Sequence, residues 1–203
     1  TGSGTLTLNG GGQVTLTTDN TYTGLTNIIS GTLIVSGNGS INDSSSIALG
    51  TSGQLVLNNS VDAIYPNPIT GTGSFMGAVI KQGTNALTLS GANTFTGGFT
   101  LESGRLTLNS ATAMGNPTGT FILNGGSLDN TSGTLNTMTP AKPQQWNTDV
   151  NFIGTNALNM GNGAVTLTAS RTVDVQASTL YTGGLVDMGS GYNLTKVGAG
   201  KLV

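Results

Sequence analysis

The sequence predicts an all-β chain that coils into a parallel β-helix, a solenoid of about nine turns. Three observations support this fold class. Short runs of alternating apolar and polar residues recur, clusters of Gly, Asn, Asp and Ser separate them, and one long segment recurs in register further along the chain. A period of two indicates a strand with one buried face, and no stretch shows the 3.6-residue period of a helix.

The expected strands follow one another at short intervals, with apolar residues on one face and Thr or another polar residue on the other. In the first strand, Leu6 and Leu8 alternate with threonines. Gly and Asn between the runs supply the turns and positive φ angles that turns require. In chain order the runs span residues 5–8, 13–17, 32–35, 54–57, 86–89, 105–108, 164–168 and 172–175.

The composition argues against several function classes. Cysteine and histidine are absent, which removes thiolate metal sites and the commonest general base. The net charge of −2 comes with no basic stripe, so we expect no nucleic-acid partner. No run of 18 or more apolar residues occurs, so we expect no membrane insertion by this segment. We also expect no cofactor.

An internal repeat decides the architecture. GQVTLTTDNTYTGLTNIISGTLIV begins at Gly12, and NALTLSGANTFTGGFTLESGRLTL begins at Asn85. We therefore expect 73-residue units near residues 12–84 and 85–157. A further partial unit starts at about residue 196, where Lys196 aligns with Lys81, and it stops before its own NTYTG segment. The chain is thus expected to be a single β-helix segment, an excerpt of a longer array.

The spacing of the strands favours a solenoid over a sandwich. A turn of roughly 20–25 residues holds three strands and their corners, so one 73-residue unit would make about three turns. Each turn would then pair in parallel with the last. A β-sandwich explains the alternation but not the 73-residue register.

These motifs resemble the autotransporter-associated β-strand repeats of bacterial passenger proteins. That family runs approximately as K-x-G-x-G-x-L-x-L, then S-G-x-N-T-Y-T-G-x-T, then S-G-T-L-x-L. The second copy fits this line, whereas the first has Thr18-Asp19 in place of Ser-Gly. The resemblance is weakest at residues 61–74 and 137–146. It implies a right-handed β-helix on a cell surface or in an extracellular layer, and no single activity.

The NT[YF]TG segment is expected to build a corner of the helix. Asn20 and Asn93 could adopt the left-handed conformation and stack their amides on equivalent amides of neighbouring turns. Two residues later, Tyr22 and Phe95 would point inward. After a further two residues, Gly24 and Gly97 would permit the next bend.

Carboxylates are the only general acid or base candidates. Asp129, Asp149 and Asp174 follow one another at intervals close to one turn, so they could stack on one face as in a carbohydrate-active enzyme. Isolated corner residues are the simpler interpretation. A GNGSIND segment at residues 37–43 only loosely resembles a calcium-binding repeat and occurs once. We therefore expect no catalytic and no metal residues.

Two proline-rich segments, at residues 61–68 and 140–146, are expected to be loops because proline cannot donate to a ladder. They carry Tyr65 and Trp146, which are possible loop contacts for a sugar or another subunit if exposed. The alternative is that Trp146 turns inward to seal its loop.

The overall expectation is a structural or adhesive surface protein without catalytic activity, either a stalk or a subunit of a filament or sheath. Its partners would be copies of itself or neighbouring repeats joined end to end, with a surface polysaccharide as a further candidate. The expected location is extracellular or the bacterial outer cell surface. The alternative is a carbohydrate-active enzyme or carbohydrate-binding module on the same scaffold.

Overall fold

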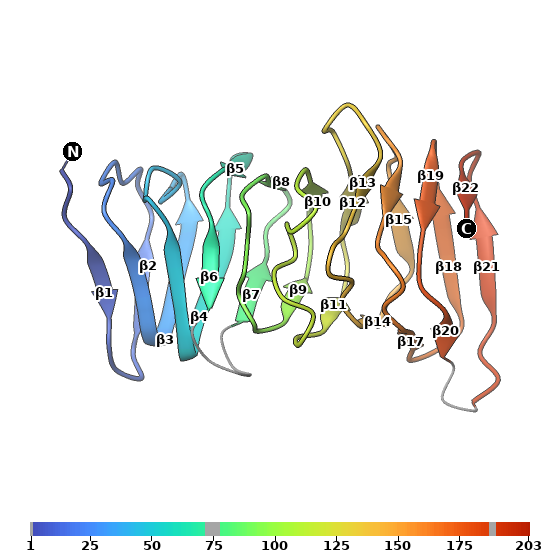
Figure 1. The fold of residues 1–203 in the computed structure, drawn as a ribbon, viewed down its shortest axis with the longest axis horizontal. Helices are drawn as coiled ribbons and strands as arrows, with labels where there is room; N and C mark the ends of the chain where they lie inside the picture. Colours follow the sequence, from blue (N-terminus) through green and yellow to red (C-terminus); the bar gives the residue numbers. More distant parts are fainter. Residues whose placement is uncertain (1, 72–77, 187–189) are drawn as a thin grey trace.

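The computed structural model describes residues 2–71, 78–186 and 190–203. Within these ranges the chain is all-β and contains no helix, hence none that could cross a membrane. Figure 1 shows a rod along which the chain winds from one end to the other. The predicted fold class is confirmed, because parallel sheets stack as a β-solenoid of about nine turns.

The first and longest sheet runs the length of the rod (Figure 1). It contains β1 (Leu6–Leu8), β2 (Gln13–Leu16), β3 (Thr26–Gly37), β4 (Ile47–Asn59), β6 (Ile69–Gly71), β7 (Ala78–Lys81), β9 (Phe99–Leu101), β11 (Phe121–Leu123), β14 (Gln144–Trp146), β17 (Val165–Leu167) and β20 (Leu185–Val186).

Two further sheets complete the wall of the rod. The second contains β5 (Ala63–Tyr65), β8 (Ala86–Leu89), β10 (Arg105–Leu108), β12 (Ser127–Asp129), β15 (Val150–Phe152), β18 (Arg171–Val175) and β21 (Leu194–Val197). The third contains β13 (Asn136–Thr137), β16 (Leu158–Asn159), β19 (Thr179–Tyr181) and β22 (Lys201–Leu202).

Every strand pairing recorded between these elements is parallel, and the interval between paired residues gives the length of a turn. The interval from Gln13 to its partner Thr32 is one of the shortest turns. Gln54 pairs with Ala78, which is one of the longest. The predicted turn length therefore holds approximately, although the shortest turns fall just below it.

Inward-facing side chains at equivalent positions of successive turns stack into columns inside the rod. In the first sheet, Leu33, Leu55, Val79, Phe99 and Phe121 follow one another in register and are all fully buried. The rings of Phe99 and Phe121 meet edge to face, with their centroids 6.0 Å apart. Burial of such an apolar column is the main stabilising contribution in a solenoid.

The 73-residue offset does not equal a whole number of turns. Val14 lies in β2 of the first sheet, but its sequence counterpart Leu87 lies in β8 of the second sheet. Three turns along the first sheet lead from Val14 to Val79, and the chain then continues to Leu87 in the next strand. The offset is therefore three turns plus one strand, and the two copies occupy different sides of the rod.

Both proline-rich segments contain a strand, so the prediction that they are loops is wrong. Residues 63–65 form β5, and residues 144–146 form β14. Proline is tolerated because Pro66, Pro140 and Pro143 lie outside the strands themselves, at the corners.

Candidate functional sites

The predicted corner asparagines bridge turns through backbone groups. Asn93 is buried; its Oδ1 accepts from the Ile69 amide at 2.8 Å, and its Nδ2 donates to the Ala113 carbonyl at 2.7 Å. Asn20 is only partly buried, and its Nδ2 donates to the carbonyls of Thr18 and Ser40, at 2.6 and 3.2 Å. Each side chain therefore joins neighbouring turns, as a corner residue should.

The expected conformation and amide stacking of these asparagines are wrong. Ser178 is the one described non-glycine residue with positive φ, at 56°. Asn20 and Asn93 need no left-handed backbone, because their side chains reach the neighbouring turns from an ordinary conformation. Amide stacking occurs elsewhere, where Asn147 Nδ2 donates to Asn124 Oδ1 at 2.8 Å on a corner of the first sheet.

The aromatic position of the motif behaves differently in its two copies. Phe95 is fully buried, whereas Tyr22 is half-buried and its hydroxyl bonds the Thr26 hydroxyl at 2.6 Å. Burial raises the pKa of Tyr22. A side chain at Gly24 would overlap the carbonyl oxygen of Gly4 in the preceding turn, so glycine permits close approach here.

Sequence reasoning missed two lysines that lie inside the rod, of which Lys81 is the first. Lys81 donates to the carbonyls of Gln82, Gly83 and Ser103, the last two at 2.9 and 3.3 Å. Lys196, its counterpart in the third copy, donates to the Gly198 carbonyl at 2.6 Å. The K-x-G segment therefore keeps one local geometry, in which lysine bonds the carbonyl of a glycine with positive φ.

Lys142 is the second buried lysine. Its Nζ donates to the carbonyls of Gly97, Asn116 and Gly119, and it lies 5.4 Å from the centre of the Phe95 ring. Burial lowers the pKa of Lys142 and of Lys81 to about 8 in each case. The alternation of apolar and polar residues along a strand does not identify these lysines as inward-facing, because it counts lysine as polar. The K-x-G-x-G motif was the available signal for Lys81.

The two aromatic residues proposed as loop contacts are not exposed. Tyr65 is 3% exposed and Trp146 is 1% exposed, because each occupies an inward position of a strand. Trp146 donates its indole N–H to Gln144 Oε1 at 3.2 Å. The Tyr65 hydroxyl is buried without a partner in the described part of the chain, and burial raises its pKa. The expected surface role is therefore wrong, and the inward alternative holds for Trp146.

The structure does not stack the three aspartates of the enzyme hypothesis. Asp174 pairs in register with Asn151, and Asn151 pairs with Ser127, two residues before Asp129. Asp129 is fully buried and accepts from the Thr155 amide and hydroxyl, at 3.0 and 2.9 Å. Asp149 is exposed and accepts from the Thr172 amide at 2.8 Å.

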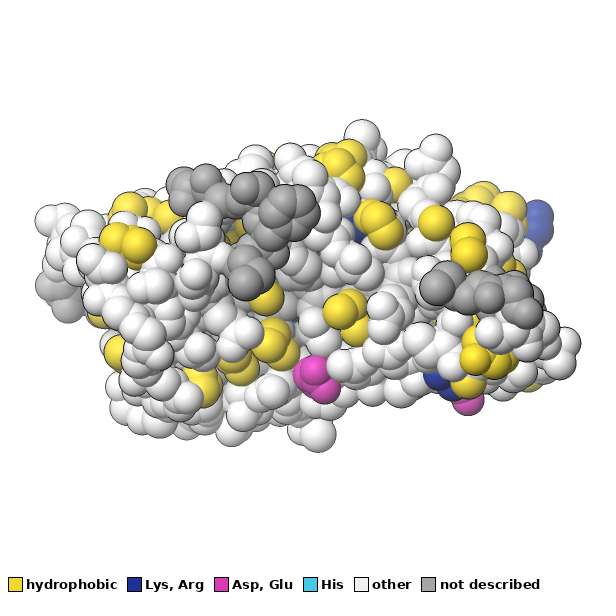
Figure 2. All heavy atoms as spheres, turned by 90° about the horizontal axis from the view of Figure 1, so that it is seen from below, with side chains coloured by type: hydrophobic (Ala, Val, Ile, Leu, Met, Phe, Trp, Pro, Cys, Tyr) yellow, Lys and Arg dark blue, Asp and Glu magenta, His cyan; other side chains and the backbone are white. Residues whose placement is uncertain are grey.

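Asp129 and Asp149 accept from backbone amides at separate places, whereas Asp174 lies within β18 and accepts from the Gln176 side chain. Across the described ranges, no three His, Cys, Asp or Glu residues converge in a way that could hold a metal ion. Asp187, another carboxylate of the sequence, lies outside the described residues. Figure 2 shows one face of the rod, on which charged side chains are few and apolar ones form small separate patches.

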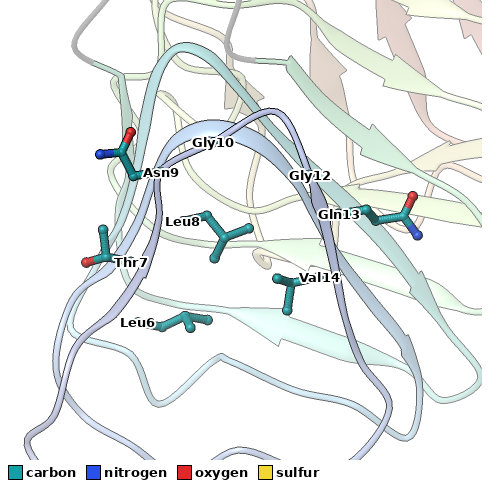
Figure 3. Close-up of a pocket in the computed structure, with 8 residues that line it drawn as sticks. All are labelled: Leu6, Thr7, Leu8, Asn9, Gly10, Gly12, Gln13 and Val14. Atoms are coloured by element: carbon teal, nitrogen blue, oxygen red, sulfur yellow. The ribbon is translucent and has the colours of Figure 1, made fainter.

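The described surface has several hollows, among them one near each end of the rod. At the N-terminal end of the rod, Leu6, Leu8 and Val14 border a space of about 290 Å³ between β1 and β2 (Figure 3). Near the other end, a groove of about 360 Å³ lies beside β19 and is lined in part by Asn159, Tyr181, Thr182 and Gly184. No sequence pattern indicated this groove, because its residues come from successive turns.

Comparison with known proteins identifies the repeats. Residues 9–35 and 79–108 match the passenger-associated-transport-repeat family. The resemblance to autotransporter passenger repeats is thereby confirmed at both copies of the NT[YF]TG segment. No curated protein and no solved structure shows a significant match to the chain.

Proposed function

We propose, from the two passenger-associated-transport repeats that the chain carries, that it is a structural or adhesive rod displayed outside a bacterial cell, without catalytic activity. The observation that supports this most strongly is the uninterrupted stacking of about nine turns around one apolar core. Such a rod holds whatever it carries at a fixed distance and offers few flexible backbone segments to a protease.

The surface chemistry fits this display role. Two of the six basic residues, Lys81 and Lys142, have their charge enclosed by backbone carbonyls, so they contribute little to the outer surface. The outside is dominated by hydroxyl and amide groups. Such a surface is soluble without a strong electrostatic field, which suits a support better than a site that steers a charged substrate.

A display experiment tests the proposal. The chain is placed between an export signal and an outer-membrane anchor of a Gram-negative host, with a tag at its outer end. Intact cells should bind a tag antibody, and proteinase K should remove the tag while leaving the rod. The control is Val79→Asp, which puts an unpaired charge in the core and should make the displayed chain protease-sensitive. Retention inside the cell, or equal digestion of both chains, would contradict the proposal.

We infer that the partner at each end is another turn of the same kind, from a neighbouring repeat or another copy of the chain. β1 and β2 each pair only with β3 in the described structure, so their outer edges are free to accept a strand. The apolar hollow beside them, where Leu8 and Val14 lie, would be covered by such a turn (Figure 3).

Electron microscopy together with sedimentation at increasing concentration tests this inference. Wild-type rods should lengthen end to end, and the double variant Leu8→Lys, Val14→Lys should stay short because two charges would be buried at the joint. The matched control is Val61→Lys, an exposed valine away from this end. Equal lengthening of all three proteins would contradict the inference.

A further inference from the structure

A hollow of about 330 Å³ lies on the side of the rod, beside β8 and β10 of the second sheet. The turns that carry β1 to β4 precede it and those that carry β17 to β22 follow it, so it is far from both ends of the rod (Figure 1). A turn added at either end would therefore leave it open. The described residues that line it are Asp62, Thr84, Asn85, Ala86, Arg105 and Ile153.

We propose that this hollow binds a uronic acid unit of an acidic oligosaccharide, with the sugar carboxylate on Arg105 and sugar hydroxyls on Asp62. The inference goes beyond the display role and does not depend on it, because the stacking of the turns does not require the hollow.

The two charged residues of the hollow flank a small side chain. Ala63 pairs with Leu87, so Asp62 lies beside Ala86. Ala86 in turn pairs with Arg105 on the next turn. Two turns thus separate Asp62 from Arg105, which places their backbones about 10 Å apart. Because only a methyl group lies between them, the space between the carboxylate and the guanidinium stays open.

The hollow continues along the rod from Arg105 to Ile153. Arg105 pairs with Ser127, which pairs with Asn151, two residues before Ile153. Phe152 is fully buried, so Ile153 faces outward, where it is partly exposed. Its aliphatic side chain offers an apolar surface against which the C–H groups of a sugar can pack.

Arg105 differs from the other arginine of the chain in that its Nε finds no partner in the fold. Arg171 Nε donates to the Trp146 carbonyl at 3.1 Å, and its Nη2 donates to the Asn147 carbonyl at 2.7 Å. Arg105 Nε, by contrast, is buried without an acceptor among the described residues. A partly desolvated guanidinium gains from a bound anion, and its planar fork of N–H groups matches a carboxylate.

Asp62 is held in place and keeps an oxygen for a ligand. Its Oδ1 accepts from the Ala86 amide at 2.8 Å and from Asn85 Nδ2 at 3.5 Å. These bonds orient the carboxylate and leave Oδ2 to accept from a sugar hydroxyl. Thr84 is exposed beside it and adds a hydroxyl of its own.

The opposite charges of Asp62 and Arg105 decide the class of ligand. A simple anion such as phosphate would be attracted by Arg105 but repelled by Asp62. A neutral sugar would leave Arg105 without an anion. A uronic acid carries a carboxylate for the guanidinium and hydroxyl donors for the aspartate, so it uses both groups.

Titration of the chain with trimers of galacturonic acid and of mannuronic acid and a tetrasaccharide of hyaluronan, followed by amide NMR, tests the proposal. At least one of the three should shift the amide signals of residues 62, 84–86, 105 and 153 in a saturable way. The methyl ester of the responding oligomer is the matched neutral ligand, and inorganic phosphate is the simple anion. Both should bind more weakly.

Two variants separate the contributions of the charged residues. Arg105→Gln should weaken the responding oligomer about ten-fold or more, through loss of the charge-assisted bonds. It should leave the melting temperature nearly unchanged, because Arg105 Nε has no acceptor in the fold to lose. Lys201→Gln, which changes the net charge equally at an exposed lysine, is the matched control and should bind normally.

Asp62→Asn distinguishes a saccharide site from a simple anion site. The amide oxygen can still accept from the Ala86 amide, so the corner keeps its bond. Loss of the carboxylate should weaken the oligomer about three-fold or more, since hydrogen bonds to a charged acceptor are the stronger ones. At a simple anion site the same change would tighten binding, because a repulsive charge is removed.

Any of the following results overturns the proposal. Shifts that map elsewhere, equal binding of the methyl ester or of phosphate, unchanged affinity in Arg105→Gln, or affinity in Asp62→Asn that is unchanged or tighter would show that the hollow is not a uronic acid site. Failure of all three oligomers to shift the folded wild-type chain at millimolar concentration would do the same.

Discussion

At the scale of single residues, asparagine side chains satisfy backbone groups that the strand ladders leave open at the corners. Asn93 bonds an amide of one turn and a carbonyl of another. Asn136 Nδ2 donates to the carbonyls of Leu108 and Ser110 in the preceding turn, at 2.8 and 3.2 Å. An unpaired buried backbone group costs about 1–3 kcal/mol in the free energy of folding. These asparagines therefore stabilise the fold by pairing such groups.

Replacement of Asn93 should therefore destabilise the rod strongly. In Asn93→Ala, the Ile69 amide and the Ala113 carbonyl lose their partner, so we expect a loss of about 2–4 kcal/mol in the free energy of unfolding. Asn20→Ala is the matched control from the first copy of the motif, and it should cost less than about 1 kcal/mol because that side chain is partly hydrated. Urea unfolding measures both, and equal losses would contradict this account of the corner.

The buried lysines predict an unusual dependence of stability on pH. Lys81 and Lys142 have pKa values lowered to about 8 in the folded chain, against 10.5 in the unfolded chain. Between these values the unfolded state binds more protons, so the free energy of unfolding should rise with pH, by at most about 1.4 kcal/mol per pH unit for each lysine. Asp62 acts on Lys81 in the opposite direction, but more weakly than burial.

Urea midpoints measured from pH 7 to 11 test this prediction. Stability should increase from about pH 8 and pass through a maximum above pH 10. Beyond that, the unfolded state gains from ionised tyrosines, because the raised pKa of Tyr65 keeps its phenol neutral in the fold. The variant Lys81→Met, Lys142→Met should lack the rise. A rise that persists in this variant would show that other groups cause it.

At the scale of elements, alternation predicted several strands, among them β8 and β10. It missed the three-residue strands β9, β11 and β15, although their inward residues are apolar too. It could not predict β13 or β16, since a strand of two residues contains no measurable period. It also failed at β14, where Gln144 occupies an inward position and a proline precedes the strand. Such short strands are formed by the stacking of turns, which a local sequence pattern does not contain.

Within one strand, inward and outward positions should differ sharply. Phe121→Ala removes a fully buried ring that packs against Phe99, so we expect a loss of about 3–5 kcal/mol. Ile122→Ala, at the next residue of β11, changes a partly exposed side chain and should cost about 1 kcal/mol or less. Thermal unfolding of both variants checks this, and a larger effect at Ile122 would mean that the strand faces the other way.

At the scale of the whole molecule, the repeat specifies local geometry and not a position around the rod. Lys81 lies in the first sheet and Lys196 in the second, yet each bonds the carbonyl of the glycine two residues later. Similarly, Val14 pairs with Leu33 and Leu87 pairs with Leu106, at the same interval along the chain but in different sheets. The motif therefore encodes one turn, and the turns between its copies rotate the next copy to another side.

The candidate sites show where sequence reasoning stops. The corner positions of Asn93 and Phe95 could be predicted, because the motif is local. The groove at Tyr181 could not, since Asn159 is brought beside it only by the stacking of two turns. The burial of Tyr65 could not be predicted either, because the nearby prolines indicated a loop where the structure has a strand.

Disulfide trapping shows whether successive turns of the chain stack in parallel and in register. The chain has no cysteine, so introduced pairs act alone. Thr100 and Ile122 are in register on adjacent turns, about 4.8 Å apart, within the range that a disulfide spans. Ile122 is also in register with Gln145, which places Thr100 and Gln145 about 10 Å apart, beyond that range.

The measurement is the fraction of intramolecular disulfide formed under mild oxidation by each double-cysteine variant. Parallel stacking predicts that the pair Thr100→Cys, Ile122→Cys forms the bond almost completely, and that the pair Thr100→Cys, Gln145→Cys does not. Efficient bonding of the second pair, or failure of the first in a folded chain, would contradict the parallel β-helix.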